Sequence, residues 1–308
     1  MRAGLVGAGY WGSNLAREIN SNPNLYLSFI VEPNEVSMDK LGKQYPNSLK
    51  YFGAEQLTPN LADIVFVATP PQNHEPVLDT LRARGYKNIC ITKPYCLSSL
   101  DAEKYTDIVK IVDYTFLFSN AVKNIKKYLE PLGKVLSIYC RRGNLGKIQQ
   151  CGVQYDLCAH DLSILCYLGF VPNTETIQGQ FSSLSMTAIM TSNNGVNISI
   201  QNSWLSHVKT KEMIFVCENG TLVYDDNEND KIRIYHSHVE LPNDSFKMQY
   251  KYGDINIPYI SANNPLGEMI NEACKSVINK EQHKTVPISL YIHRIMEKMN
   301  ACRKQQNR

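Results

Sequence analysis

The feature that most constrains this chain is a glycine-rich turn near its N-terminus. The run Gly-Ala-Gly-Tyr-Trp-Gly at residues 7–12 fits G-x-G-x-x-G and directly follows the short apolar run at residues 3–6. A strand, this turn and a helix in succession are typical of dinucleotide binding. The first glycine permits a tight turn, the second lets the backbone approach a pyrophosphate, and the third lets helix and strand pack closely. The residues expected at the phosphates are Gly7, Gly9, Tyr10, Trp11 and Gly12.

An acidic residue at the end of the next apolar run indicates which dinucleotide binds. Glu32 follows residues 26–31 and lies 20 residues after Gly12. Its carboxylate can accept hydrogen bonds from a ribose hydroxyl and would repel a 2′-phosphate. The three residues that follow it carry no positive charge that could bind such a phosphate. We therefore predict NAD as the cofactor and regard NADP as less favoured.

Short apolar runs alternate with amphipathic stretches through the first part of the chain. Strands that are separated by helices connect through right-handed crossovers into a parallel sheet. The sequence therefore predicts an α/β protein whose residues 1–113 form a Rossmann domain with a doubly wound parallel sheet. Its expected strands are residues 3–6, 26–31, 62–68 and 88–92, and its expected helices are residues 10–20 and 75–84.

The pattern of apolar and polar residues changes after about residue 113. Two Asn-Gly turn signals, at residues 194–195 and 219–220, are flanked by alternating apolar and polar residues. Such alternation is typical of antiparallel strands with one buried face. We predict residues 114–308 to be a C-terminal α/β domain with an open, mostly antiparallel sheet, and leave open whether its last helix packs back on the first domain. The expected helices are residues 121–129, 155–168, 266–278 and 289–302, and the first expected strand is residues 135–141.

Two turns should lie at the ligand-binding edge of the parallel sheet, because ligands bind beyond the carboxyl ends of its strands. Lys93 ends the strand at 88–92; beside a cationic nicotinamide it could take part in proton transfer or hydroxyl binding, whereas the alternative is a solvent-facing lysine before a turn. For His74 we expect a cofactor-side role and no catalytic one, although by itself it is more simply the start of a helix. The cofactor-side residues expected after the strand at 62–68 are Thr69, Pro70, Asn73 and His74.

A carboxylate and an imidazole open the long helix of the second domain. Asp156 and His160 are four residues apart, so an α-helix would place them on one face. Histidine is the natural base for a hydroxyl proton at neutral pH, and a carboxylate one turn away can orient it or bind a neighbouring hydroxyl. A surface pair is the alternative. A metal site is disfavoured, because no third ligand stands at a recognised spacing.

Together these motifs resemble the Gfo/Idh/MocA family of NAD(P)-dependent oxidoreductases. The resemblance covers nearly the whole chain and rests on the order of GAGYWG, ATPPQNH, a Lys-Pro at a strand end and Asp-x-x-x-His on a later helix. It implies that Lys93, Asp156 and His160 form the active site, and that the Lys93–Pro94 peptide is cis.

Two features depart from the family pattern. Thr92 stands where the family has a Glu before the Lys, which puts the support of Lys93 in question. The stretch at residues 97–112 also looks short for the helix that normally precedes the next strand. The run at residues 113–116 still matches the family's crossover strand.

The resemblance implies hydride transfer between NAD and a secondary alcohol, with His160 as the base, Lys93 bonded to the reacting oxygen and Asp156 orienting the substrate or His160. A basic stretch before the catalytic helix could bind a carboxylate or diphosphate, which favours a nucleotide sugar over a free sugar; a solvated basic loop is the equal alternative. The family also includes dinucleotide-binding sensors without turnover, and this second class is kept. The expected substrate-binding residues are Arg141, Arg142, Asn144 and Lys147.

Composition excludes several other classes. A formal net charge of +3 with no basic run disfavours a nucleic-acid partner. No apolar run approaches the roughly 18 residues of a membrane span, and no secretory signal is recognised, so we expect a cytoplasmic protein without a membrane partner. Nine scattered cysteines without a CxxC indicate reduced thiols and no metal. An exposed face on the second sheet suggests a homodimer or homotetramer.

Overall fold

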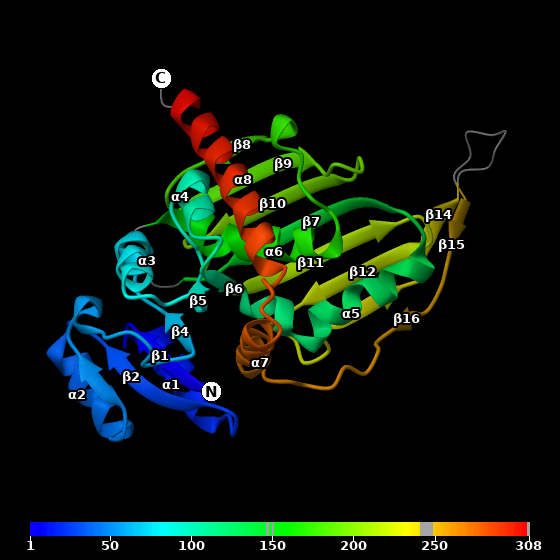
Figure 1. Ribbon diagram of the computed structural model, residues 1–308. Coiled ribbons are helices and arrows are strands. Elements are labelled where there is room, and N and C mark those ends of the chain that lie inside the picture. Colours follow the sequence, from blue (N-terminus) through cyan, green and yellow to red (C-terminus); the bar gives the residue numbers. More distant parts are fainter. Residues whose placement is uncertain (146–147, 150, 241–248, 307–308) are drawn as a thin grey trace. The chain divides into compact units, whose positions relative to one another are not determined.

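The computed structural model describes residues 1–145, 148–149, 151–240 and 249–306 (Figure 1). The chain divides into two compact units. Unit 1 holds Met1–Phe118 and Asn264–Arg294, and unit 2 holds Ser119–Asn263 and Ile295–Arg308. The sequence places the boundary after residue 113. The first unit instead extends to Phe118, because the turn Thr115–Phe118 packs against the helix that begins at Pro265.

Unit 1 is built on the expected parallel sheet. Six strands pair in the order β3-β2-β1-β4-β5-β6, and every pairing between them is parallel. The order reverses between β1 and β4, which is the point where doubly wound sheets bind ligands. The strands are β1 Arg2–Val6, β2 Tyr26–Val31, β3 Leu49–Tyr51, β4 Ile64–Val67, β5 Ile89–Thr92 and β6 Val109–Asp113.

Capping residues mark the ends of several helices in unit 1. Asn34 and Ser98 each accept a hydrogen bond from a backbone N–H in the first turn of the helix that follows. Gly85, with φ of +82°, follows the third helix. The helices are α1 Tyr10–Ser21, α2 Glu35–Gln44, α3 His74–Ala83, α4 Ser99–Lys104, α7 Pro265–Ile278 and α8 Thr285–Gln306, the last of which continues into unit 2.

The edge strand β6 is covered by a segment from near the C-terminal end of the chain. The backbone N–H of His283 donates to the carbonyl oxygen of Lys110, and the backbone N–H of Val112 donates to Oγ1 of Thr285. The side-chain amide of Gln282 donates to the carbonyl oxygen of Val109. These bonds satisfy polar groups that an open sheet edge would leave exposed.

Unit 2 contains the second expected sheet. Eight strands pair in the order β16-β13-β12-β11-β7-β10-β9-β8 (Figure 1), with β7 and β10 parallel and the other neighbours antiparallel. The prediction of a mostly antiparallel sheet is thus confirmed. The strands are β7 Val135–Gly143, β8 Gln178–Phe181, β9 Ser185–Thr191, β10 Asn197–Ser203, β11 Thr210–Cys217, β12 Gly220–Asp225, β13 Ile232–Tyr235 and β16 Ile255–Asn256, and β14 His238–Glu240 pairs separately with β15 Gln249–Lys251.

Two local expectations differ from the structure. The run at residues 113–116 is not a strand, because β6 ends at Asp113 and Thr115–Phe118 forms a 3-10 turn. The predicted helix at 155–168 is α6, Ala159–Leu168, preceded by a π-helical turn, Gln154–Cys158. The other long helix within unit 2, α5, spans Asn120–Leu129.

Within the described part of the chain, none of the helices has both the length and the apolar character needed to cross a membrane.

Candidate functional site

The glycine turn between β1 and α1 has the geometry that a pyrophosphate requires. Gly7 has φ of +99°, and a Cβ there would lie 2.7 Å from the carbonyl oxygen of Ala68. A Cβ on Gly12 would lie 1.9 Å from the carbonyl oxygen of Gly7, whereas one on Gly9 would meet nothing within 4 Å. The first and third glycines are therefore needed for the turn and the packing of helix on strand. The exposed Gly9 leaves the backbone open to a ligand, so the turn fits a bound dinucleotide.

Glu32 lies beside this turn. Its Oε2 accepts a hydrogen bond from the backbone N–H of Ala8 at 2.6 Å, and its Oε1 accepts one from the N–H of Asn34 at 2.9 Å. A carboxylate has about four lone-pair sites, so both oxygens retain the capacity to accept from a ribose hydroxyl. The two backbone bonds thus hold the carboxylate beside the glycine turn.

Trp11 is anchored by a residue that the sequence argument did not select. Its indole Nε1 donates to Oδ2 of Asp113 at 2.8 Å, and Oγ1 of Thr115 donates to Oδ1 of the same carboxylate at 2.8 Å. Burial raises the pKa of Asp113, and these two donors together with the charge of Lys93 oppose that rise. An acidic residue at the buried end of β6 was the available signal. Tyr10, beside Trp11, is 84% exposed.

His74 connects two turns at the carboxyl edge of the sheet. The side chain is fully buried; Nε2 lies 2.9 Å from the carbonyl oxygen of Thr69, and Nδ1 lies 2.9 Å from that of Pro94. Burial lowers the pKa of His74, and the carbonyl oxygens at its ring nitrogens act in the opposite direction. This burial argues against direct contact with a cofactor. Of the other residues expected in this turn, Pro70 and Asn73 are exposed and Thr69 is half-buried.

Lys93 directly follows β5 at the same edge of the sheet. It is half-buried, and the Lys93–Pro94 peptide is cis, as the family resemblance implies. Thr92, the last residue of β5, pairs with Asp113 of β6. The lysine is therefore placed at the end of a strand that belongs to the ligand-binding edge.

In unit 2, Asp156 and His160 lie on consecutive helical segments. Asp156 belongs to the π-helical turn and His160 to the first turn of α6, and both side chains are half-buried. The indole Nε1 of Trp204, which follows β10, donates to Oδ2 of Asp156 at 3.1 Å. π-helical turns frequently occur at functional sites. Trp204 is 2% exposed, and the sequence argument did not select it.

Arg142 contacts a protein carboxylate in place of the expected substrate. Its Nε lies 2.9 Å and its Nη2 2.8 Å from Oδ1 of Asp161, and the side-chain amide of Asn202 donates to Oδ2 at 2.8 Å. Both members of the ion pair are buried. We therefore remove Arg142 from the expected substrate contacts, because its guanidinium belongs to the core of unit 2.

The remaining members of the basic stretch differ in exposure. Arg141 is exposed and Asn144 is half-buried, with its backbone N–H donating to the carbonyl oxygen of Ser203 at 3.1 Å. Lys147 lies outside the described residues. Arg141 and Asn144 therefore remain candidates for contact with a substrate.

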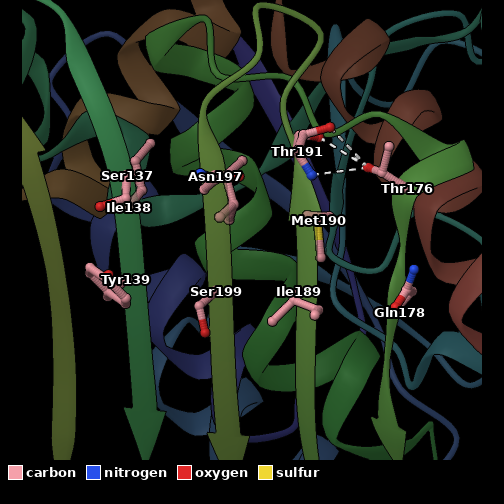
Figure 2. Close-up of a pocket in the computed structure, with 11 residues that line it drawn as sticks. Ser137, Ile138, Tyr139, Thr176, Gln178, Ile189, Met190, Thr191, Asn197 and Ser199 are labelled. Carbon is pink, nitrogen blue, oxygen red and sulfur yellow. Dashed lines mark hydrogen bonds between the residues drawn. The ribbon is translucent and has the colours of Figure 1, made fainter.

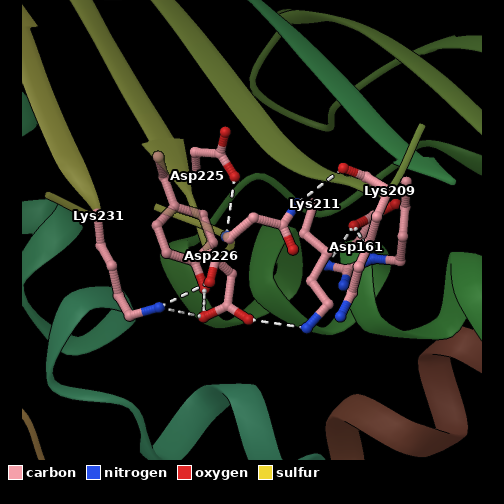
Figure 3. A network of polar contacts seen from close by, with 9 residues as sticks. Asp161, Lys209, Lys211, Asp225, Asp226 and Lys231 are labelled. Carbon is pink, nitrogen blue, oxygen red and sulfur yellow. Dashed lines mark hydrogen bonds and ion pairs between the residues drawn. The ribbon is translucent and has the colours of Figure 1, made fainter. Parts of the chain in front are cut away.

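A second polar cluster on the same sheet is centred on Asp226 (Figure 3). Its Oδ2 lies 3.0 Å from Nζ of Lys211, and its Oδ1 lies 3.0 Å from Nζ of Lys231. Burial alone would raise the pKa of Asp226, and the two ammonium groups reverse this effect and hold it below its usual value. The carboxylate of Asp226 thus has both of its oxygens paired with ammonium groups of unit 2.

A shallow pocket of about 420 Å³ lies over strands β7 to β10 of unit 2 (Figure 2). Tyr139 and Ile189 in its lining are about half exposed, and the other contributors are hydroxyl, amide, aliphatic and thioether side chains. This lining contains no group that exchanges protons near neutral pH, so it suits contact with another protein surface better than acid–base chemistry. The candidate reaction residues Asp156 and His160 do not line it.

The fold and the glycine turn define a dinucleotide-binding α/β protein. Residues 1–117 match the Gfo/Idh/MocA oxidoreductase family, described as having an NAD-binding Rossmann fold. The match covers the dinucleotide-binding part of the chain, from β1 through the turn that follows β6.

Relatives and solved structures extend the likeness. The chain is 30% identical over 203 residues to an uncharacterized oxidoreductase of Streptococcus pneumoniae, covering 58% of this chain and 53% of that protein. It is 28% identical over 200 residues to 2,7-anhydro-N-acetylneuraminate hydratase of Escherichia coli, covering 57% and 52%. The chain thus spans about half the length of these relatives. Levoglucosan dehydrogenase, solved with NADH and levoglucosan, shares the fold with a TM-score of 0.80 at 14% identity, covering 99% of this chain and 97% of that one.

Proposed function

We propose that this protein is an NAD-dependent oxidoreductase that transfers a hydride between the nicotinamide and a secondary alcohol of a sugar or nucleotide sugar. The observation that carries the proposal is the open backbone at Gly9, set between two glycines that tolerate no side chain and beside the fixed carboxylate of Glu32. This combination favours a dinucleotide whose ribose bears free hydroxyls, and therefore NAD.

The proposed roles of the protein's own groups follow from their chemistry. Bound NAD would supply the ring that accepts or returns the hydride. His160 takes the hydroxyl proton of the alcohol in the oxidative direction, since an imidazole exchanges protons near neutral pH. Lys93 donates a hydrogen bond to the reacting oxygen. Asp156, already held by Trp204, orients the alcohol or His160.

The proposed substrate class draws on two similar proteins and on one exposed arginine. Two similar proteins act on sugars by name, 2,7-anhydro-N-acetylneuraminate hydratase and levoglucosan dehydrogenase. Arg141 is exposed near the start of the catalytic segment and could bind a carboxylate or diphosphate. We therefore propose a sugar that carries such an anionic group, with nucleotide sugars as the first candidates.

A spectrophotometric screen tests the proposal. Purified protein is mixed with NAD and a panel of sugars, inositols and nucleotide sugars, and NADH is followed by its absorbance. We expect sustained turnover on at least one member that Lys93→Met and His160→Asn each reduce at least about a hundredfold, the usual scale of lost acid–base catalysis. Arg141→Met should raise the KM for anionic substrates and leave NAD binding unchanged.

A dinucleotide-binding sensor is the competing function. It predicts tight NAD binding by calorimetry and no turnover in either direction, including reduction of keto-sugars with NADH. That result would overturn the enzyme proposal while leaving the cofactor assignment intact. No binding of NAD or NADP would overturn both.

We also propose that the protein is a homodimer or homotetramer that covers the exposed sheet face of unit 2. Tyr139 and Ile189 expose apolar surface there, and oligomers commonly cover such a face. Sedimentation of the wild type and of Ile189→Lys tests this. A monomeric wild type contradicts it, as does an assembly that the added charge leaves unchanged.

A further inference from the structure

The carboxylate of Asp113 is held in an environment that is costly for a charge. It is 4% exposed, and its two oxygens accept hydrogen bonds from the side chains of Trp11 and Thr115 at 2.8 Å each. Both donors are neutral. Because a buried charge is unfavourable unless a partner of opposite charge compensates it, the site calls for a nearby cation.

The strand register places Asp113 opposite Thr92, the residue that directly precedes a lysine. Thr92 of β5 and Asp113 of β6 are partners in a parallel pairing, and paired residues of neighbouring strands present their side chains to the same face of the sheet. Lys93 follows Thr92 directly, at the point where β5 ends. The carboxylate and the lysine therefore share the carboxyl edge of two adjacent strands.

The electrostatics of Asp113 agree with this placement. Burial raises the pKa of its carboxyl group most strongly. The bonds from Thr115 and Trp11 and the charge of Lys93 act in the opposite direction. Lys93 is thus the cation that favours the charged form of this carboxylate.

We propose that Asp113 is the positioning residue of Lys93: a carboxylate supplied by the neighbouring strand holds the lysine ammonium at the carboxyl edge of the sheet. The effect of Asp113 on catalysis rests on the proposed function. The contact between Asp113 and Lys93 is independent of that function. Since Trp11 belongs to the glycine turn and bonds the same carboxylate, Asp113 also connects the cofactor turn to the lysine.

The first test measures the reactivity of Lys93 without any substrate. Wild type and Asp113→Asn are treated with a lysine-acetylating reagent at pH 8, and the rate at Lys93 is read by proteolysis and mass spectrometry. Loss of the carboxylate should make Lys93 react several-fold faster, because a held ammonium is a poor nucleophile. The matched control is Asp63→Asn, which removes the same charge at the opposite, amino-terminal end of β4 and should leave the rate unchanged.

The second test is rescue from the partner position. Thr92→Glu in the Asp113→Asn background restores a carboxylate on the same face, one strand away, and should return the labelling rate of Lys93 toward the wild-type value. A purely structural role for Asp113 would not be rescued in this way. If thermal melting shows that Asp113→Asn does not fold, the single variant Thr92→Glu is tested instead. Its added carboxylate should slow the labelling of Lys93 below the wild-type rate.

The outcomes separate this inference from the proposed function. If a substrate is found, Asp113→Asn should lower kcat with little change in NAD affinity, and the double variant should regain part of it. Absence of turnover in the wild type contradicts the proposed function. The labelling rates then still test whether Asp113 holds Lys93. Unchanged labelling of Lys93 in a folded Asp113→Asn, or labelling that Thr92→Glu does not slow, overturns the inference.

Discussion

The indole of Trp204 donates a 3.1 Å hydrogen bond to the carboxylate of Asp156 across 48 residues of sequence. The tryptophan is almost fully buried at the end of β10, whereas the aspartate is half-buried in a π-helical turn. A rigid core residue therefore fixes the orientation of a group that we assign to the reaction.

Trp204→Phe should weaken the reaction more than the fold. The substitution keeps an aromatic ring and removes the donor, and a hydrogen bond to a charged group contributes about 1.5–3 kcal/mol. We expect kcat to fall about ten- to a hundredfold, with the Kd for NAD unchanged by calorimetry. A variant with full kcat would show that Asp156 does not need this bond.

Gly9→Ala and Gly12→Ala form a matched pair at the glycine turn. A Cβ on Gly9 meets nothing within 4 Å, so the alanine variant should melt near the wild-type temperature and bind NAD at least about tenfold more weakly, because the methyl group blocks the pyrophosphate. A Cβ on Gly12 would lie 1.9 Å from a backbone oxygen, so Gly12→Ala should lower the melting temperature. Equal NAD affinity in Gly9→Ala would contradict the assigned phosphate site.

Arg142→Met and Arg141→Met should separate a core residue from a surface residue. Removing Arg142 leaves the buried carboxylate of Asp161 with the side-chain amide of Asn202 and no cation from β7, and breaking a buried pair costs about 3–5 kcal/mol. Replacing the exposed Arg141 should change stability by less than about 0.5 kcal/mol. Urea unfolding measures both. Similar losses in the two variants would contradict the assignment.

Unit 1 should lose stability as the pH falls from 7 to 5. Burial, aided by the charge of Lys284, lowers the pKa of His283 to about 4. The unfolded chain, whose histidine titrates near 6.5, therefore binds a proton that the folded chain does not bind between pH 6.5 and 4. We expect His283 to contribute about 1–2 kcal/mol to this loss, discounted for its partial exposure. His74 acts in the same direction, because burial lowers its pKa as well.

His283→Asn isolates that contribution. The backbone N–H of Thr285 donates to Nδ1 of His283 at 3.3 Å, and an asparagine oxygen can accept the same bond without titrating. The difference in unfolding free energy between pH 7 and pH 5 should therefore be smaller in the variant. An unchanged difference would assign the pH dependence to other groups.

Local patterns in the sequence were sufficient to predict the two sheets and the glycine turn. G-x-G-x-x-G after a strand specifies its own geometry, and alternation of apolar residues specifies which face of an antiparallel strand is buried. The same alternation could have corrected one expectation. In β7 the buried positions include Ile138, Cys140 and Arg142, so Arg142 follows the core face and Arg141 the exposed one.

The supporting residues of the candidate site could not be read in this way. Trp11 bonds Asp113 across 102 residues, and Asp156 bonds Trp204 across 48. Nothing in the local sequence of either partner predicts its bond, and each bond is seen only in the folded chain. Likewise, nothing in the spacing of Asp156 and His160 distinguishes a π-helical turn from an α-helix.

The segment that caps β6 has a consequence for synthesis of the protein. Gln282, His283 and Thr285 supply the bonds along that strand, yet they are made after the whole of the second sheet. In a nascent or truncated chain that ends before these residues, the backbone amide and carbonyl groups along the edge of β6 are unpaired. Such an exposed strand edge can pair with another copy of the chain. Shortened forms of this protein should therefore aggregate even when they retain every residue of the dinucleotide turn.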